Sequence, residues 1–344
     1  MLHVTVLFNA TQSVVGSSKV TNERKGICMR RSLFLILAGV LLATELNAQP
    51  VGGAPQLWFS PGDDLEFRGI VSHPDFPKLF EEPSLWPTGL SHINVIEFRQ
   101  AYIARKPAES LKYYNYLKAH HIALAVAMTV MPAENCGQGI EGIMSRKGID
   151  FYSKAIKGAG IDIDYVLMDE PLYFGHDYTG KDACRLPIAD VARGVAESVA
   201  TIRSYHPKAK FVLGEPVALP GGVAELAEFL DAYKATTHEY PFSVELDVQW
   251  PKNWRSELPP LVNWLKARGI GYGIIYNATG GTKGDHAWVS SAKLNAQAVA
   301  SAIHINPQHV MIQTWETYPV PIVPESNPDT MTGYLKWFVE HASH

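Results

Sequence analysis

The sequence has few of the features that mark several common classes of protein. Its 344 residues include only three cysteines, so it is not a small disulfide-rich scaffold. Lys and Arg number 30 against 34 Asp and Glu, which leaves no basic excess for binding nucleic acid. No apolar run reaches the length of about 20 residues that a membrane-spanning helix needs. A composition that is 47% hydrophobic therefore indicates a globular protein with a large core.

The longest apolar run near the N-terminus is typical of a signal peptide. Met29–Ala48 contains two arginines, then the apolar run Leu33–Leu42, then small residues that suit a cleavage site. We expect cleavage after Ala48, which removes 1–48 as an N-terminal extension plus signal peptide and leaves 49–344 as one domain. An uncleaved anchor is the alternative. The domain is expected in the periplasm or outside the cell.

From Gln56 onward, strand-like and helix-like segments alternate along the sequence. Eight such pairs over roughly 290 residues predict an α/β fold, a single (β/α)8 barrel. An open doubly wound sheet is disfavoured, because no glycine-rich phosphate turn follows the first strand. The expected strands are Gln56–Ser60, Ile93–Phe98, Ile122–Val130, the Tyr165–Pro171 stretch, Lys210–Leu213, Phe242–Trp250, Tyr272–Asn277 and His309–Thr314. The expected helices are Phe76–Leu90, Ala108–His120, Phe151–Lys157, Ile188–Tyr205, Val223–Thr236, Glu257–Arg268, Ala287–Ile303 and Met331–Ala342.

Acidic and aromatic residues dominate the C-terminal ends of the expected strands, where barrels of this class place their active sites. The fourth strand runs from apolar residues directly into Asp169 and Glu170. Because side chains alternate along a strand, we expect Glu170 to face the substrate and Asp169 to support it. The other candidates at strand ends are Asp63, Asp64, Arg99, Tyr102, Glu215, Asp247, Trp250, Tyr276, Asn277, Trp315 and Glu316.

Carboxyl groups beside aromatic rings are the groups that cleavage of a glycosidic bond requires. One carboxyl protonates the leaving oxygen, and a second attacks the sugar or activates water. We therefore predict an exported enzyme that cleaves an oligo- or polysaccharide, with Glu170 as the general acid. Its expected partner is Glu316, Asp247 or Glu215, in that order. The expected substrate-binding residues are Arg99, Tyr102, Asp169, Tyr173, Glu215, Trp250, Asn277 and Trp315.

The Asp-Glu-Pro triplet at 169–171 resembles the Asn-Glu-Pro that follows the fourth strand in the large retaining clan of barrel glycoside hydrolases. Arg99 and Trp315 have similar counterparts there. The resemblance covers the whole barrel in architecture but only these few residues in motif. It implies an acid/base role for Glu170. The sequence departs from the clan at the end of the seventh strand, where Asn277 and the tyrosine before it stand in place of the nucleophilic glutamate.

Two other functions stay open at this point. A divalent cation held by strand-end carboxylates would make a metal-dependent, sugar-converting enzyme. The departure at the seventh strand would also suit a barrel that binds carbohydrate without cleaving it. For the leading prediction we expect no cofactor, no metal, a carbohydrate partner, no nucleic acid, no membrane after signal cleavage, and a monomer. The carboxylates that could hold the cation are Glu170, Glu215, Asp247 and Glu316.

Cys136 and Cys184 are the two cysteines beyond residue 48. They lie in the loops after the third and fourth expected strands, which are neighbours in a barrel. In an oxidising compartment we expect a disulfide between them, with two buried thiols as the alternative. His176, in the loop after Glu170, is expected to be a solvated side chain.

Overall fold

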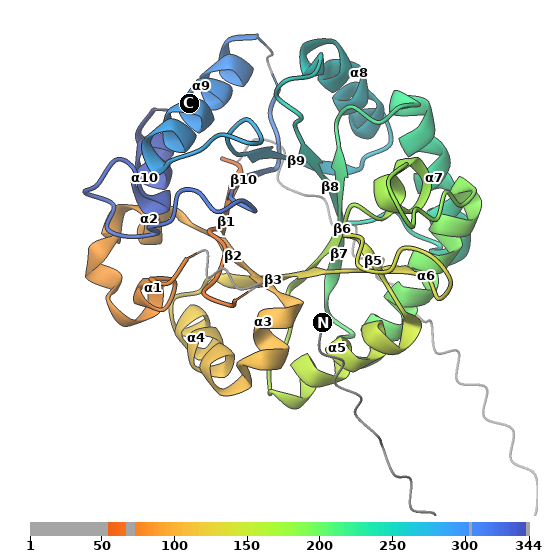
Figure 1. Ribbon diagram of the computed structural model, residues 1–344, viewed down its shortest axis with the longest axis horizontal. Helices are drawn as coiled ribbons and strands as arrows, with labels where there is room; N and C mark the ends of the chain where they lie inside the picture. The colour runs from red at the N-terminus through yellow and green to blue at the C-terminus, as the bar shows by residue number, and fades with distance from the viewer. Residues whose placement is uncertain (1–53, 67–72, 303–304, 342–344) are drawn as a thin grey trace, which may run out of the picture. The chain divides into compact units, whose positions relative to one another are not determined.

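Eight parallel strands close into a barrel, which confirms the predicted single (β/α)8 fold. The computed structural model describes residues 54–66, 73–302 and 305–341, so the expected signal peptide lies outside the described residues. Figure 1 looks into the barrel, with helices arranged around the ring of strands. The strands follow one another around the barrel in chain order, and the last pairs with the first to close it. They are β1 Gln56–Ser60, β2 Val95–Arg99, β3 Ala123–Met128, β6 Tyr165–Asp169, β7 Lys210–Pro216, β8 Ser243–Asp247, β9 Gly271–Tyr276 and β10 His309–Gln313.

Each barrel strand overlaps a predicted one, and the differences lie at the ends. β7 runs further than predicted, to Pro216, because Glu215 and Pro216 pair with β8. A separate two-stranded pair, β4 Met131–Pro132 with β5 Ile143–Met144, forms in the long loop after β3. This loop therefore has a fixed shape beside the mouth of the barrel.

The helices differ from prediction mainly in the first half of the chain. The segment at 76–90 is divided at Pro83 and Pro87, as the two prolines led us to expect, because proline ends a preceding helix and suits the first turn of the next. The short helix after β2 was not predicted. None of the helices within the described ranges is long and apolar enough to cross a membrane. The helices are α1 Lys78–Glu81, η1 Pro83–Leu85, α2 Pro87–His92, α3 Gln100–Arg105, α4 Pro107–Ala119, α5 Arg146–Gly158, η2 Tyr173–Asp177, α6 Ile188–Tyr205, α7 Gly222–Thr237, α8 Trp254–Ala267, α9 Asp285–Ala302 and α10 Met331–His341.

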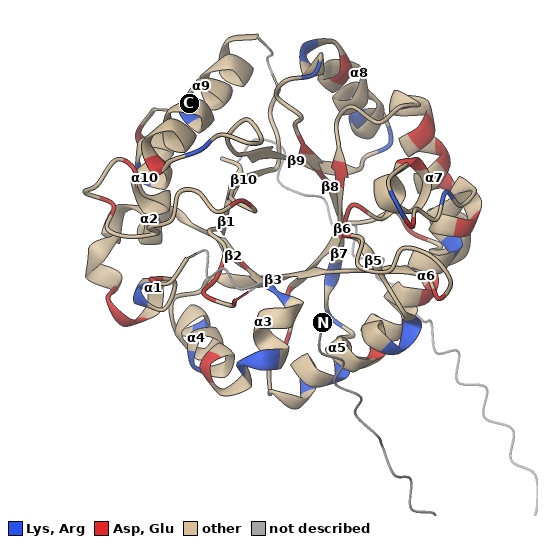
Figure 2. Ribbon diagram, in the orientation of Figure 1, with Lys and Arg blue, Asp and Glu red and all other residues tan. Residues whose placement is uncertain are grey.

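Alternation along the strands separates two apolar layers. Residues such as Val244 and Leu246 on β8 point outward into the large core between strands and helices. The other side faces the barrel interior, which holds a smaller apolar cluster. Figure 2 shows acidic positions (red) around the central opening, near the labels of β6 and β8. The inner cluster comprises Trp58, Val95, Ala125, Tyr165, Leu167, Val212, Ile275 and Met311.

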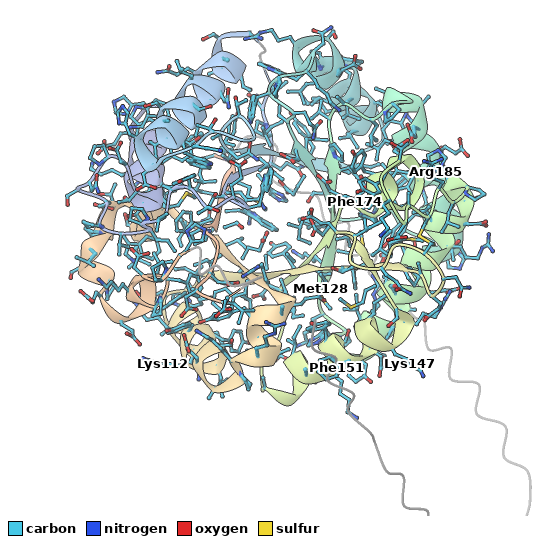
Figure 3. All side chains as sticks on the ribbon, in the orientation of Figure 1. Lys112, Met128, Lys147, Phe151, Phe174 and Arg185 are labelled. Atoms are coloured by element: carbon cyan, nitrogen blue, oxygen red, sulfur yellow. A yellow bond between two sulfur atoms is a disulfide. The ribbon has the colours of Figure 1, made fainter. Side chains whose placement is uncertain are left out.

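Cys136 and Cys184 form a disulfide, as predicted, with their Cα atoms 5.1 Å apart. The backbone N–H of Gly137 donates to the carbonyl of Asp182 at 2.7 Å, so the two loops also pair beside the bridge. Figure 3 shows the sulfur atoms in yellow near the labelled Arg185. The bridge ties the loop that follows β3 to the loop that follows β6.

Removing this bridge is expected to lower the free energy of unfolding. The two cysteines are 48 residues apart in the sequence. Closing a loop of that length restricts the unfolded chain by about 4 kcal/mol in the chain-entropy description. Urea unfolding of the oxidised protein and of the double variant Cys136→Ser, Cys184→Ser would measure the difference. Equal midpoints would show that the bridge contributes nothing to stability.

Candidate active site

Four carboxyl groups gather at the C-terminal mouth of the barrel: Asp169 and Glu170 from the end of β6, Asp247 from the end of β8, and Glu141 from the loop that leads into β5. The acidic positions near β6 and β8 in Figure 2 mark this part of the opening. The structure thus brings together three of the predicted site residues. It adds Glu141, for which the sequence carried no periodic signal because the residue lies in a loop.

Burial is the main cause of the raised pKa values in this group. It raises the pKa of Asp169 to about 8, with further contributions from the charges of Glu141, Glu97 and Asp247. Burial, and then Asp247, raise the pKa of Glu170 well above its usual range. Burial also raises the pKa of Asp247. Negative charges gathered in partly buried positions resist ionising together near neutral pH. The mouth therefore holds carboxylic acids that can donate a proton.

Glu170 has an unusual backbone conformation, with a φ of 42°. Side chains other than glycine rarely adopt this left-handed region, and such strain clusters at functional sites. Its N–H donates to the carbonyl of Gly214 at 3.2 Å, and its own carbonyl accepts from Phe174 at 3.1 Å. Glu170 is therefore the point at which the β6 ladder stops and the chain turns into η2. Strand alternation holds up to Asp169, which falls on the inner side with Leu167.

Asp247 is oriented by a chain of two hydrogen bonds. The Asn277 amide donates to Asp247 Oδ1 at 3.2 Å, and the Trp250 indole donates to Asn277 Oδ1 at 2.6 Å. Trp250 is buried and stacks against Tyr276, so it does not offer an exposed face to a sugar. This position does not favour the substrate contact predicted for Trp250. Trp250 and Asn277 instead position Asp247 at the mouth.

Glu215 lies close enough to the carboxyl groups at the mouth for its charge to raise the pKa of Glu170, but its hydrogen bonds are to the backbone of the next turn. It is fully buried, and its carboxylate accepts hydrogen bonds from the backbone N–H groups of Leu172 at 2.7 Å and Tyr173 at 3.2 Å. Its strand position is the outer one, because Val212 lies in the inner cluster. The predicted contact between Glu215 and substrate is corrected accordingly: Glu215 holds the turn that follows Glu170.

Tyr102 also has a structural position rather than the predicted contact with substrate. It lies in α3, is fully buried, and packs edge-on against Phe76 and Phe98. Its hydroxyl donates to Glu109 Oε1 at 2.7 Å. Tyr173, in contrast, is half-buried on η2, where burial and then the charge of Glu170 raise its pKa. Tyr173 thus stays a candidate for contact with a ligand.

The structure does not bring Glu316, the partner that the sequence favoured, to Glu170. Its Oε1 accepts from the backbone N–H of Gly281 at 2.7 Å, so it anchors the loop after β9. None of the four clustered carboxyls has Glu316 among the charges that shift its pKa. Asp247, the second candidate of the sequence analysis, is the carboxyl whose charge raises the pKa of Glu170 most. Trp315, on the loop after β10, is 65% exposed and keeps a free aromatic face.

Arg99, at the end of β2, forms a two-pronged ion pair with the buried Asp63. Its Nε donates to Asp63 Oδ2 at 2.6 Å, and a second guanidinium nitrogen reaches Oδ1. Next to it, Lys106 donates to Asp64 at 2.6 Å. The two aspartates after β1 therefore serve mainly to hold basic side chains. The Arg99 side chain is still 44% exposed, which leaves a cationic edge at the end of β2, two strands from the acids of β6 around the barrel.

The barrel interior beneath the mouth contains polar residues that the sequence analysis did not select. Glu245 is fully buried, and its Oε1 lies 2.7 Å from Nδ1 of the buried His309. Glu97 accepts from the Ser60 hydroxyl at 3.0 Å, and burial, with help from Glu245, raises its pKa to about 7. A Cβ at Gly273 would come within 1.8 Å of Glu245, so the glycine makes room for this carboxyl. The alternation on β8, which places Glu245 with Asp247, was the one available signal.

The raised pKa of Asp169 predicts a stability that falls with rising pH. The group ordinarily has a pKa of 3.8, against about 8 in the folded protein, so between these values the folded state keeps a proton that the unfolded chain has lost. The contribution of this proton to the free energy of unfolding is complete below about pH 4 and is lost as the pH rises to about 8. Asp169→Asn should flatten this dependence in urea unfolding measured near both limits. If the variant's free energy of unfolding falls with pH as steeply as that of wild type, the raised pKa of Asp169 is contradicted.

No protein-family model matches the chain, and no curated protein sequence matches it. Among solved structures it is similar to a GH10 endoxylanase retrieved from a sugarcane soil metagenome, with 9% identity, a TM-score of 0.51, and coverage of 83% of this chain and 96% of that one. The Ignisphaera aggregans GH53 catalytic domain matches at 11% identity and a TM-score of 0.46, over 77% of this chain and 85% of that one. The endoxylanase match supports the fold alone, a TIM barrel.

Proposed function

We propose that this protein is a glycoside hydrolase that uses Glu170 as its general acid and Asp247 as the second carboxyl group. The observation that carries the proposal is the gathering of Asp169, Glu170 and Asp247 in partly buried positions at the mouth of a closed barrel, which raises all three pKa values. In glycosidases the catalytic groups are two carboxyl groups, one kept protonated and the other ionised.

The geometry suggests separate roles for the two groups. Asp247 accepts a hydrogen bond from Asn277, which lowers its pKa against the effect of burial and favours the ionised form. For Glu170 every charge that shifts the pKa raises it. Of the two, Glu170 is thus the better proton donor, and Asp247 the better candidate to activate water or attack the sugar. The exposed edges of Arg99 and Trp315 are available for substrate hydroxyl groups and ring faces.

A panel of oligo- and polysaccharides tests the proposal directly. The full chain is expected to release reducing sugar from at least one member. A chelator should leave the rate unchanged while the protein stays folded, because the acid pair itself needs no metal. Loss of turnover in chelator that the folded His176→Gln variant also shows would favour the metal-dependent, sugar-converting alternative. Binding to a glycan with no turnover would favour a carbohydrate-binding barrel. The anomer first released would then separate retention from inversion.

A further inference from the structure

A second cluster of polar side chains lies beyond the mouth, where η2 meets the start of α7. His176 and Asp177 come from η2, and Glu225 comes from the first turn of α7. One ligand atom from each of the three lies within 4.8 Å of the other two. Glu225 is only 7% exposed. This grouping contrasts with the solvated position that the sequence analysis gave to His176.

The cluster brings two carboxyl groups and one imidazole together. His176 Nδ1 lies 2.6 Å from the carbonyl of Leu186, which can only accept, so Nδ1 carries a hydrogen and Nε2 is the ring nitrogen left to bind an ion. Nε2 faces Glu225 Oε1 at 3.7 Å. Glu225 Oε2 already accepts from the backbone N–H of Gly221 at 2.5 Å. Glu225 Oε1 and Asp177 Oδ2 are both buried and have no N–H or hydroxyl donor, so without a cation only a proton shared between the two carboxyl groups would satisfy them. Buried acceptors without partners are costly unless a cation or a donor lies between them.

We propose that His176, Asp177 and Glu225 form a binding site for a divalent transition-metal ion such as Mn²⁺ or Zn²⁺. One imidazole nitrogen with two carboxylates is a donor set that these ions accept, whereas Ca²⁺ and Mg²⁺ favour oxygen ligands throughout. The bond from Nδ1 to the Leu186 carbonyl is the support that fixes a ligating histidine in its ring orientation. Water would complete the coordination on the exposed side of His176. The expectation of no metal is thereby revised.

The ion would join two segments that are far apart in the sequence. η2 begins three residues after Glu170, and Glu225 stands on the next helix but one along the chain. Binding would therefore add a cross-link between the loop after β6 and α7, in addition to the contact that Glu215 makes with the same loop. This role is structural, so it does not depend on the proposed glycoside hydrolysis.

Calorimetric titration of the untagged, chelator-treated full chain with MnCl₂ and then ZnCl₂ tests the site. Wild type is expected to bind one ion per chain and to unfold at a higher temperature when the ion is present, because only the folded state holds all three ligands. Glu225→Gln and His176→Gln should each weaken binding by at least about tenfold. Glu228→Gln, on the exposed side of α7, and His120→Gln, exposed at the end of α4, are the matched controls and should bind as wild type does.

Circular dichroism would confirm that each variant is folded, and either site variant alone suffices if the other fails to fold. Wild type that binds neither ion overturns the proposal. So does equal binding in wild type and in the folded site variants, since the ion would then sit elsewhere. A Glu225→Gln variant that is more stable than metal-free wild type, in a protein that binds no ion, would show that a shared proton satisfies the cluster.

Discussion

Glu170→Gln is expected to reduce glycoside hydrolysis by about 10³-fold while leaving the protein folded. Glutamine has nearly the same shape but cannot donate a proton to the leaving oxygen. Glutamine is neutral beside Asp247 without having to take up a proton, so the free energy of unfolding should stay equal or increase. Steady-state rates on the glycan that wild type cleaves best would measure the loss, and urea unfolding would measure the stability.

The leaving group provides a sharper check on the role of Glu170. An aryl glycoside with an acidic phenol leaves without full protonation, so the variant should lose much less rate on it than on the natural glycan. Glu228→Gln, whose side chain is exposed on α7, is the control and should behave as wild type on both substrates. Near-normal activity of Glu170→Gln on the natural glycan would remove Glu170 from the mechanism. An equal loss on both substrates would assign it a role other than that of the acid.

Glu215→Ala is expected to lower the free energy of unfolding by about 3 kcal/mol. The change leaves the backbone N–H groups of Leu172 and Tyr173 without an acceptor in a buried place. Each buried group left unpaired costs about 1–3 kcal/mol, and the loss of a repelled, desolvated carboxylate offsets part of that. Urea unfolding at neutral pH would measure the difference from wild type.

Glu215→Gln is the matched comparison, because its amide oxygen can still accept from Leu172. It should lose about 1 kcal/mol, less than the alanine variant. The alanine variant should also hydrolyse glycans more slowly, since the turn that holds Glu170 would move. An alanine variant as stable as the glutamine one would show that the two hydrogen bonds do not hold the loop.

The fold could be predicted because its signals are local. Apolar runs separated by amphipathic segments occur eight times, and each barrel strand overlaps a predicted one. The clear stripe of Ile188–Tyr205 matched α6 at both ends. The helix after β2 was missed because six residues are too few to show a period. Cys136 and Cys184 could be paired because they follow neighbouring strands.

The site was harder to predict because strand order does not say which side of a strand faces inward. Both faces of β7 are apolar, so nothing in the sequence placed Glu215 on the outer one. On β8 the polar residues alternate, and there the inward position of Asp247 could be inferred. Glu141 and Glu97 acquire their roles only through neighbours distant in sequence. Likewise, the hydrogen bond from the Trp250 indole to Asn277 helps to hold Trp250 in a buried position, and the sequence alone does not show that bond.

The left-handed backbone of Glu170 has a consequence for how relatives of this chain would diverge. Glycine and asparagine adopt that conformation at lower energy than glutamate, and neither would leave a buried acid beside Asp247. A protein that keeps glutamate at position 170 is therefore less stable than a variant that differs from it by this one substitution. If Glu170 has the role proposed, a lineage released from selection for the reaction should drift to glycine or asparagine at this position. Its identity in a relative would then distinguish enzymes from inactive descendants.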